Sequence, residues 1–439
     1  MKFRNCAMAI AVFGAALTLV SPVNAASEEA THEARIRELE ETVAELKALL
    51  EQQSGELAET SVRVEETDEA VLHPADHPST FEETQIKVGG FIKMDAFVSD
   101  YSKAPTVGNG DDFFIPRSLH TSGENRDPRL NLHSKETRFW LKSSTPSERG
   151  DIRTYFEIDF LQGQQSDERV GSSFSPRLRH AHISWGHWTV GQTWTNFFNT
   201  SSLPEYVDFL GPVGVVFARQ AQVRYMLPTE HGSWVFTLEN PETTLTPFGG
   251  GIRIDADDSV IPDLIVRRNW TADWGNISVA AMLRQLKIDR VGLDDSEIGG
   301  AIALAGKFKV GDRDDVRWQA NYGNALGRYM GLNSYNVGAL DANGQIHLTT
   351  EYGVLAAYRH VWNVKLHSSL GGSFSQADND TDISGIAEPG AYQSAHVNLI
   401  WSPVQRMSFG AEYIWGRRED DSGDDGILNR FQLGAKYIY

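Results

Sequence analysis

The sequence predicts an all-β protein, a 16-stranded antiparallel transmembrane β-barrel that follows an N-terminal coiled-coil helix. Three observations predict the barrel: short segments in which apolar and polar residues alternate, connections that alternate in length, and aromatic residues near segment ends. Alternation with a period of two is typical of strands with one apolar and one wet face. No later stretch approaches the roughly eighteen consecutive apolar residues of a transmembrane helix.

Residues 1–25 form a signal peptide. Two basic residues precede an apolar core over residues 6–20, and Val23-Asn24-Ala25 is a small-residue cleavage site. We expect cleavage after Ala25 or after Ala26. A transmembrane anchor is the alternative, but the apolar run is short and ends at Ser21-Pro22. The chain is therefore expected to be exported.

Charge and cysteine content exclude several classes of site. The formal net charge is −19, and residues 27–83 hold seventeen Asp and Glu against four Lys and Arg, so nucleic acid is not an expected partner. The single cysteine, Cys6, lies in the signal peptide, which leaves the mature chain without a disulfide or thiolate ligand. His180 and His182 lack a third ligand at a metal-site spacing. We expect no metal, no cofactor and, because no catalytic motif is present, no enzyme.

Residues 26–57 have the pattern of a coiled-coil helix. Apolar residues recur at alternating spacings of three and four, which is a heptad seam, in a segment rich in good helix formers. The seam consists of Ile36, Leu39, Val43, Leu46, Leu50 and Leu57. A lone helix with one narrow apolar stripe is marginally stable, so the seam predicts self-association, with a trimer expected. The alternative is a solvated amphipathic helix. Residues 58–84, acidic and proline-containing, are expected to be a flexible linker.

Residues 85–439 carry the alternating segments of the barrel. In residues 152–160 the odd and even positions separate into an apolar and a charged set. Fourteen or eighteen strands are the alternatives to sixteen. The expected strands are residues 88–98, 136–142, 152–160, 178–185, 188–195, 218–227, 233–240, 262–272, 275–286, 297–309, 315–323, 348–361, 364–376, 392–402, 407–418 and 429–439.

The connections between these strands alternate strictly in length. Seven are short, such as Gly186-His187 and Asp273-Trp274. Eight are long: residues 99–134, 161–177, 196–217, 241–261, 287–296, 324–347, 377–391 and 419–428. Sixteen antiparallel strands need this number of each if both termini lie at the short-turn end. A soluble β-sandwich gives no physical reason for loop lengths that alternate in this way.

The last strand and the tryptophans favour a membrane barrel. Phe431, Leu433, Tyr437 and Tyr439 occupy one phase of the final segment, whose other phase is mostly polar. Many tryptophans lie near strand ends, where an amphipathic ring can occupy the headgroup boundary. An apolar outer face leaves the polar phase inside, around an aqueous lumen.

The polar phase of the strands is rich in basic residues. Arginine on the lipid face would cost about 2–4 kcal/mol, so these residues are expected to face inward and to favour carboxylates. The alternative is that they pair with acidic wall residues and only hold the shape of the lumen. The expected pore-lining set is Arg138, Arg153, Arg224, Arg267, Arg284, Arg317, Arg359 and Lys365.

The long connection over residues 196–217 is unusually apolar. Apolar side chains are unfavourable in a solvated loop. We therefore expect this connection to fold into the barrel, pack on the wall and narrow the passage. Glu205, Tyr206 and Asp208 would lie at this constriction, with the two acids opposite the arginines. The alternative is that the same surface forms a subunit contact.

The chain resembles the DcaP-type trimeric outer-membrane porins. The residues that carry the resemblance are the helical seam, the run Val88–Ala96, Ser99-Asp100-Tyr101, Arg177–Ala181 and Gly191–Trp194. The resemblance implies a homotrimer in a Gram-negative outer membrane, a periplasmic coiled coil and passive uptake of small anionic solutes. It identifies no individual constriction residue.

The sequence thus predicts a porin for carboxylates or dicarboxylates, surrounded by outer-membrane lipid and lipopolysaccharide. The alternative is a structural or adhesive barrel, tethered through its periplasmic helix, that transports nothing selectively. Ion conductance distinguishes the two classes.

Overall fold

The computed structural model describes residues 84–103, 112–125, 127–161 and 171–439. The expected signal peptide, the seam residues Ile36 to Leu57 and residues 58–83 of the expected linker lie outside these ranges. None of the helices within the described ranges is long and apolar enough to cross a bilayer.

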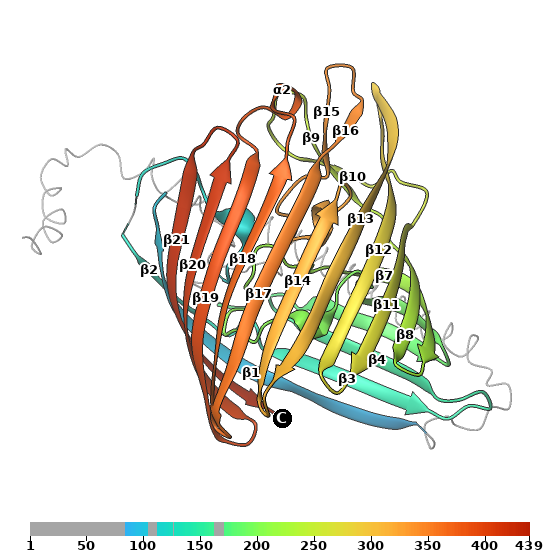
Figure 1. Ribbon diagram of the computed structural model, residues 1–439, viewed down its shortest axis with the longest axis vertical. Helices are drawn as coiled ribbons and strands as arrows, with labels where there is room; N and C mark the ends of the chain where they lie inside the picture. Colours follow the sequence, from blue (N-terminus) through green and yellow to red (C-terminus); the bar gives the residue numbers. More distant parts are fainter. Residues whose placement is uncertain (1–83, 104–111, 126, 162–170) are drawn as a thin grey trace, which may run out of the picture. The chain divides into compact units, whose positions relative to one another are not determined.

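Sixteen strands form a closed antiparallel barrel (Figure 1). Each strand pairs with the next along the chain, and β1 pairs with both β3 and β21, which closes the ring. The barrel strands are β1 (Gln85–Tyr101), β3 (Arg138–Thr145), β4 (Ile152–Asp159), β5 (Arg177–Trp185), β6 (Trp188–Trp194), β7 (Arg219–Thr229), β8 (Gly232–Glu239), β11 (Asp263–Ala272), β12 (Gly275–Arg290), β13 (Leu293–Val310), β14 (Asp314–Gly323), β17 (Thr350–Asn363), β18 (Leu366–Asp378), β19 (Pro389–Val404), β20 (Met407–Asp420) and β21 (Asp425–Ile438).

The strand pairing along β1 is interrupted after the first long loop. β2 (Arg129–His133) and β3 both pair with β1, one after the other along its edge. Residues 134–137 between them leave the ladder and carry Lys135 and Glu136. The expected strand over residues 136–142 therefore starts two residues later, at Arg138.

The outer face of the barrel is apolar and the inner face is polar. In β1, Ile92 and Met94 are exposed, whereas Lys93 and Asp95 between them are buried. The same separation holds in β21, where Phe431 and Leu433 are exposed and Gln432 is buried. This inversion relative to a soluble sheet is what the alternating pattern predicts.

Several tryptophans lie on the outer surface near the short turns. Trp185 and Trp188 flank the turn Gly186-His187, and Trp274 and Trp362 lie at the β11–β12 and β17–β18 turns. Tyr439 lies at the same end of the barrel, where its backbone N–H donates to the carbonyl oxygen of Gly90 in β1 (Figure 1).

Two connections that were expected to be long loops are hairpins. β12 and β13 continue pairing to Arg290 and Leu293, so only Val291-Gly292 remains between them. β20 and β21 likewise continue until four residues, 421–424, are left. The expectation for residues 287–296 and 419–428 was wrong because polar residues beyond a membrane can still pair as strands.

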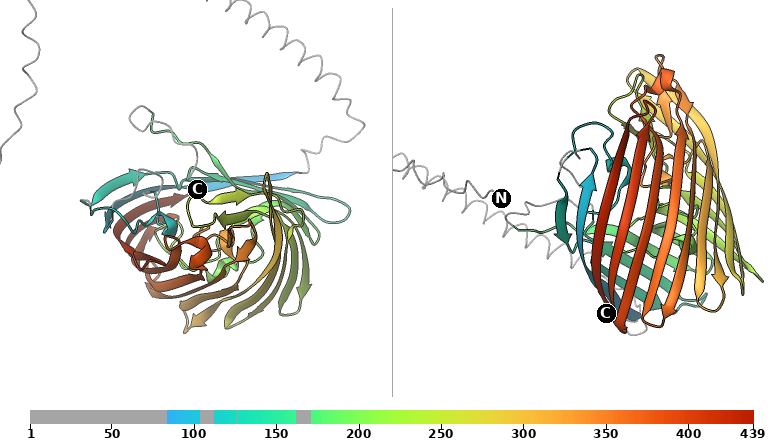
Figure 2. Two further views of the ribbon diagram at one scale, coloured as in Figure 1. Left: turned by 90° about the horizontal axis from the view of Figure 1, so that it is seen from above. Right: turned by 60° about the vertical axis from the view of Figure 1, so that its left-hand side comes forward.

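The long loops hold short elements of their own. β9 (Thr243–Thr246), β10 (Ile254–Ala256), β15 (Gly338–Leu340) and β16 (Ile346–Leu348) form a separate four-stranded sheet. An α-helix, α2 (Thr381–Ser384), and 3-10 helices at Pro116–Ser118, Thr200–Ser202 and Gly327–Tyr329 complete the described elements. Seen from above, loop segments lie inside the ring of strands (Figure 2).

Candidate functional site

Residues 195–218, here called the inner loop, connect β6 to β7 and lie against the inner wall. The backbone N–H of Gly214 donates to Ser373 Oγ of β18 at 2.8 Å. The N–H of Val216 donates to Gln319 Oε1 of β14 at 2.9 Å. These wall strands lie far from β6 and β7 in the ring, so the loop crosses the interior.

The apolar residues of the inner loop pack into a cluster inside the barrel. They meet apolar residues of the first long loop, of residues 325–335 and of the wall. Three loops therefore fill part of the lumen with apolar side chains at this level, and the prediction that residues 196–217 fold into the barrel and pack on its wall is confirmed. The cluster includes Phe113, Phe114, Leu119, Phe197, Phe198, Leu210, Val213, Val215, Val216, Tyr329, Met330 and Tyr335.

Inward arginines of β7 and β11 hold the start of the inner loop. Arg267 Nη1 donates to the carbonyl oxygen of Phe198 at 2.5 Å. Arg224 Nη2 donates to the carbonyl oxygen of Trp194 at 2.6 Å. Among the described residues, neither arginine has a carboxylate within 4 Å, so neither is held in a close ion pair.

Two more arginines, from β14 and β17, meet the middle of the loop. Arg317 and Arg359 share Asp315, with Nε to oxygen distances of 2.7 and 2.8 Å. Arg317 Nη1 also donates to the carbonyl oxygen of Leu203 at 2.7 Å. Arg359 Nη1 lies 3.3 Å from Glu205 Oε2. Loop and wall therefore meet at a mixed group with two guanidinium ions and two carboxylates.

Glu205 is an ionised member of this group. Its Oε1 lies 3.4 Å from His367 Nε2, and its backbone carbonyl accepts from Asn398 Nδ2 at 2.9 Å. The contact with His367, aided by Arg359 and Arg317, lowers the pKa of Glu205 to about 2. The carboxylate is thus ionised throughout the ordinary pH range.

The other two residues expected at the constriction have different surroundings. The Tyr206 ring stacks on His396 with centroids 4.5 Å apart. Asp208 is buried and accepts from the backbone N–H groups of Phe114, at 3.1 Å, and Gly211, at 3.2 Å. Asp208 therefore fastens loop to loop, through backbone groups rather than through one of the predicted arginines.

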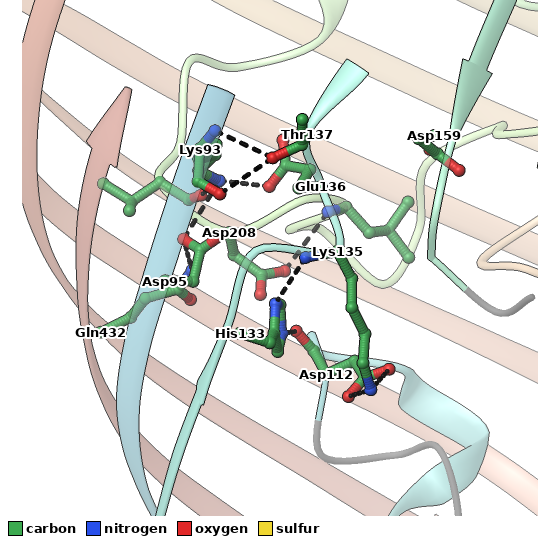
Figure 3. Close-up of polar contacts among 12 residues, drawn as sticks. Lys93, Asp95, Asp112, His133, Lys135, Glu136, Thr137, Asp159, Asp208 and Gln432 are labelled. Atoms are coloured by element: carbon green, nitrogen blue, oxygen red, sulfur yellow. Dashed lines mark hydrogen bonds and ion pairs between the residues drawn. The ribbon is translucent and has the colours of Figure 1, made fainter. Parts of the chain in front are cut away.

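A further charged group lies where β1 meets the inner loop (Figure 3). Lys93 Nζ donates to the carbonyl oxygen of Val207 at 2.6 Å and lies 3.2 Å from Asp95 and in contact with Glu136. Asp95 also accepts from Gln432 Nε2 at 2.9 Å. Lys93 was not among the predicted pore-lining residues, although its place between Ile92 and Met94 marks it as inward.

Lys93 borders a cavity of about 250 Å³ on the short-turn side of the inner loop. Lys436, whose Nζ lies 5.6 Å from the Phe91 ring centroid, also lines it. Its lining contains both signs of charge, with Glu136 and Glu205 beside the basic residues. The charged lining includes Lys93, Glu136, Glu205, His367, Arg406 and Lys436.

The remaining predicted basic residues do not join this group. Arg138 lies 3.6 Å from Glu157 in the wall. Arg153 and Lys365 are exposed at short turns. Arg284 is completely buried against Asp263 at 2.9 Å, so it does not line a passage, and the expectation for it was wrong.

No cluster of three or more His, Cys, Asp or Glu suited to a metal ion is present in the parts of the chain that the structure describes. The observed group consists of fixed charges and hydrogen-bond donors around a loop inside a barrel.

The chain is similar to solved barrels from several bacteria. The outer membrane channel DcaP of Acinetobacter baumannii shares 24% sequence identity, with 82% of this chain and 98% of that chain covered and a TM-score of 0.71. An anion-selective porin from Comamonas acidovorans shares 11% identity over 81% of this chain and all of that chain (100%), with a TM-score of 0.49. OmpT of Vibrio cholerae in a trimer form shares 12% identity over 81% and 99%, with a TM-score of 0.49.

A comparison with curated proteins finds no match. The family model described as DcaP outer membrane protein matches residues 18–439, which include every described strand. The chain therefore belongs to the DcaP outer membrane protein family.

Proposed function

We propose that this protein forms a water-filled trimeric channel in the outer membrane for passive uptake of small anionic solutes, chiefly carboxylates and dicarboxylates. The observation that carries the proposal is the convergence of Arg267, Arg317 and Arg359, from three wall strands, on the inner loop. A guanidinium keeps its charge at any usable pH and pairs with carboxylates through two parallel hydrogen bonds.

The net sign of this group favours anions. Asp315 and Glu205 offset Arg317 and Arg359. Arg224 and Arg267 add two charges that no carboxylate within 4 Å offsets among the described residues. A surplus of positive charge in a narrow passage with low-dielectric walls raises the local concentration of anions. The Acinetobacter protein with the same fold is an outer membrane channel, which supports transport as the class of function.

The rest of the proposed organisation rests on the sequence. Residues 1–25 are removed on export, residues 26–57 trimerise as a coiled coil in the periplasm, residues 58–84 link this helix to the barrel, and residues 85–439 span the membrane. Outer-membrane lipid and lipopolysaccharide surround the exposed apolar band.

Reversal potentials across planar bilayers test the selectivity with variants of opposite sign. In a potassium chloride gradient the wild type should prefer chloride. The double variant Arg317→Ala, Arg359→Ala should lower the anion-to-cation permeability ratio roughly fivefold, an effect of about 1 kcal/mol. Glu205→Gln should raise the ratio, because it removes a carboxylate that stays charged. Glu205 itself should remain ionised between pH 5 and pH 8, because its pKa is about 2.

Arg153→Ala is the matched control, since Arg153 is exposed at a short turn and paired only with Asp151 among the described residues. Its selectivity should equal that of the wild type. A wild-type preference for potassium would contradict anion uptake. A folded protein without any conductance would favour the structural or adhesive barrel.

A further inference from the structure

A second pocket lies at the long-loop end of the barrel, away from the group described above. It has a volume of about 300 Å³ and is here called the mouth pocket. Three arginines from separate elements line it: Arg177 at the start of β5, Arg219 at the start of β7 and Arg328 in a 3-10 helix. Apolar side chains form other parts of its lining, namely Ile115, Phe217 and Leu332.

The pocket opens where two wall strands separate. β5 and β6 pair only from Ala181 and Gln192 toward their turn. Beyond that point the first residues of β5 pair with β4 alone, and those at the end of β6 pair with β7. The Gln192 side chain bridges the gap by donating to the carbonyl oxygen of Leu178 at 3.1 Å. The wall thus has a notch at its upper edge, beside the mouth pocket.

Two of the three arginines are already neutralised. Arg177 makes a bidentate pair with Asp159, with nitrogen to oxygen distances of 2.8 and 2.7 Å. Arg328 Nη1 lies 3.1 Å from Glu242 Oε2. These two residues shape the pocket and add positive potential at longer range.

Arg219 differs from both. Its guanidinium carbon lies 4.5 Å from the centroid of the Trp194 ring and 5.8 Å from that of Phe217. Across the described ranges, no carboxylate lies within ion-pair distance of it, and its buried Nη1 has no hydrogen-bond partner. Leaving a charged donor unsatisfied is costly, so this position suits a guanidinium whose partner is a ligand.

We propose that the mouth pocket is a capture site for small aromatic carboxylates, in which Arg219 binds the carboxylate and Phe217, Ile115 and Leu332 contact the ring. The aromatic rings beneath Arg219 hold the guanidinium plane by cation–π contact and leave its nitrogen edge for the ligand. Its role in uptake rests on the proposed function, but the binding itself does not. The long loops face outward in barrels of this kind, so the site lies at the end of the barrel from which an external solute enters.

Saturation-transfer NMR on the purified full-length protein in detergent tests the site without any need for conduction. Benzoate is the probe, benzyl alcohol its uncharged counterpart and acetate the carboxylate without a ring. We expect benzoate to bind roughly tenfold more tightly than either, because each counterpart lacks one of the two contacts. Equal binding of benzoate and benzyl alcohol would contradict an arginine site, and equal binding of acetate would contradict the aromatic preference.

Variants assign the site to its residue. Arg219→Ala should weaken benzoate binding roughly tenfold or more, and Arg219→Lys, which keeps the charge but loses the bidentate geometry, should lie between. Arg417→Ala is the charge-matched control, since Arg417 lies outside the pocket and pairs with Glu419 and Asp425. Heated and unheated gel mobility verifies that each variant is folded.

The outcomes separate this inference from the proposed function. Unchanged benzoate binding in folded Arg219→Ala overturns the mouth pocket as the site, whatever the ion selectivity of the channel. Loss of binding in Arg219→Ala, with the chloride-to-potassium selectivity still anionic, supports both. If Arg219→Ala loses benzoate binding but the channel prefers cations, the result supports the mouth pocket as the site and contradicts anion uptake.

Discussion

Arg284 shows how an inward arginine can serve the wall of a barrel. Its Nε lies 2.9 Å from Asp263 Oδ2, its Nη1 donates to the carbonyl oxygen of Ala325 at 3.0 Å, and neither charged side chain is exposed. Arg317 and Arg359 occupy the same phase of their strands but remain partly exposed beside the inner loop. The phase of a strand predicts whether a side chain points into or out of the barrel. Its ion-pair partner and its degree of burial depend on loops that are distant in sequence.

Loss of the Arg284 side chain should therefore destabilise the barrel. Arg284→Met leaves the Asp263 carboxylate buried without its cation, which costs about 3–5 kcal/mol. The folded band on unheated gels should disappear at a lower temperature than in the wild type. Arg290→Met is the control, because Arg290 is exposed at the end of the same strand. A wild-type melting temperature for Arg284→Met would show that the pair adds nothing to stability.

At the scale of elements, the inner loop depends on close backbone contact with the wall. A Cβ atom at Gly214 would lie 2.5 Å from the carbonyl oxygen of Phe374 and 2.8 Å from the backbone nitrogen of Val354. Asn321 Nδ2 also donates to the Gly214 carbonyl at 2.9 Å. Only glycine allows the loop to approach β17 and β18 this closely.

Gly214→Val should push the loop off the wall and enlarge the passage. Single-channel conductance should rise, since the loop would fill less of the lumen. Gly372→Ala on β18 is the control, because its added Cβ would meet nothing closer than 3.7 Å. A conductance below that of the wild type would mean that the displaced loop blocks the passage instead.

Most of the elements could be predicted from the sequence. All sixteen barrel strands occur within a few residues of their predicted ranges, because alternation is a local signal. The sheet of β9, β10, β15 and β16 was not predicted, since its strands of three or four residues pair only after the barrel brings two loops together. The mouth pocket was missed for the same reason. Arg177, Arg219 and Arg328 come from three distant segments, and Arg219 differs only in lacking a carboxylate partner within the described ranges.

At the scale of the whole barrel, the strands differ in length around the ring. β3, β4 and β6 have seven or eight residues, whereas β12, β13 and β19 have sixteen to eighteen. β12 and β13 continue into a hairpin at the long-loop end, whereas β6 ends at the notch beside β5. The ring is closed by eleven residue pairs between β1 and β21, from Phe91 with Ile438 to Tyr101 with Leu428.

Removal of residues 425–439 should prevent closure altogether. β1 and β20 would each lose a partner, and the unpaired backbone groups could not be satisfied in lipid. The truncated chain should give no heat-modifiable folded band. Shortening the β12–β13 hairpin at residues 289–294 is the control, since it trims the hairpin next to its Val291-Gly292 turn and leaves the β1–β21 seam intact. A folded truncated barrel would show that the seam is dispensable.

The pairing of β1 with β21 also constrains how a cell makes this protein. The two partners leave the ribosome more than three hundred residues apart. Until the last strand pairs with β1, two sheet edges therefore remain unpaired, and the apolar residues of the outer face are exposed wherever lipid does not cover them. Chaperones that cover such surfaces are needed until insertion, and any delay in supplying the final strand exposes the chain to aggregation and proteolysis.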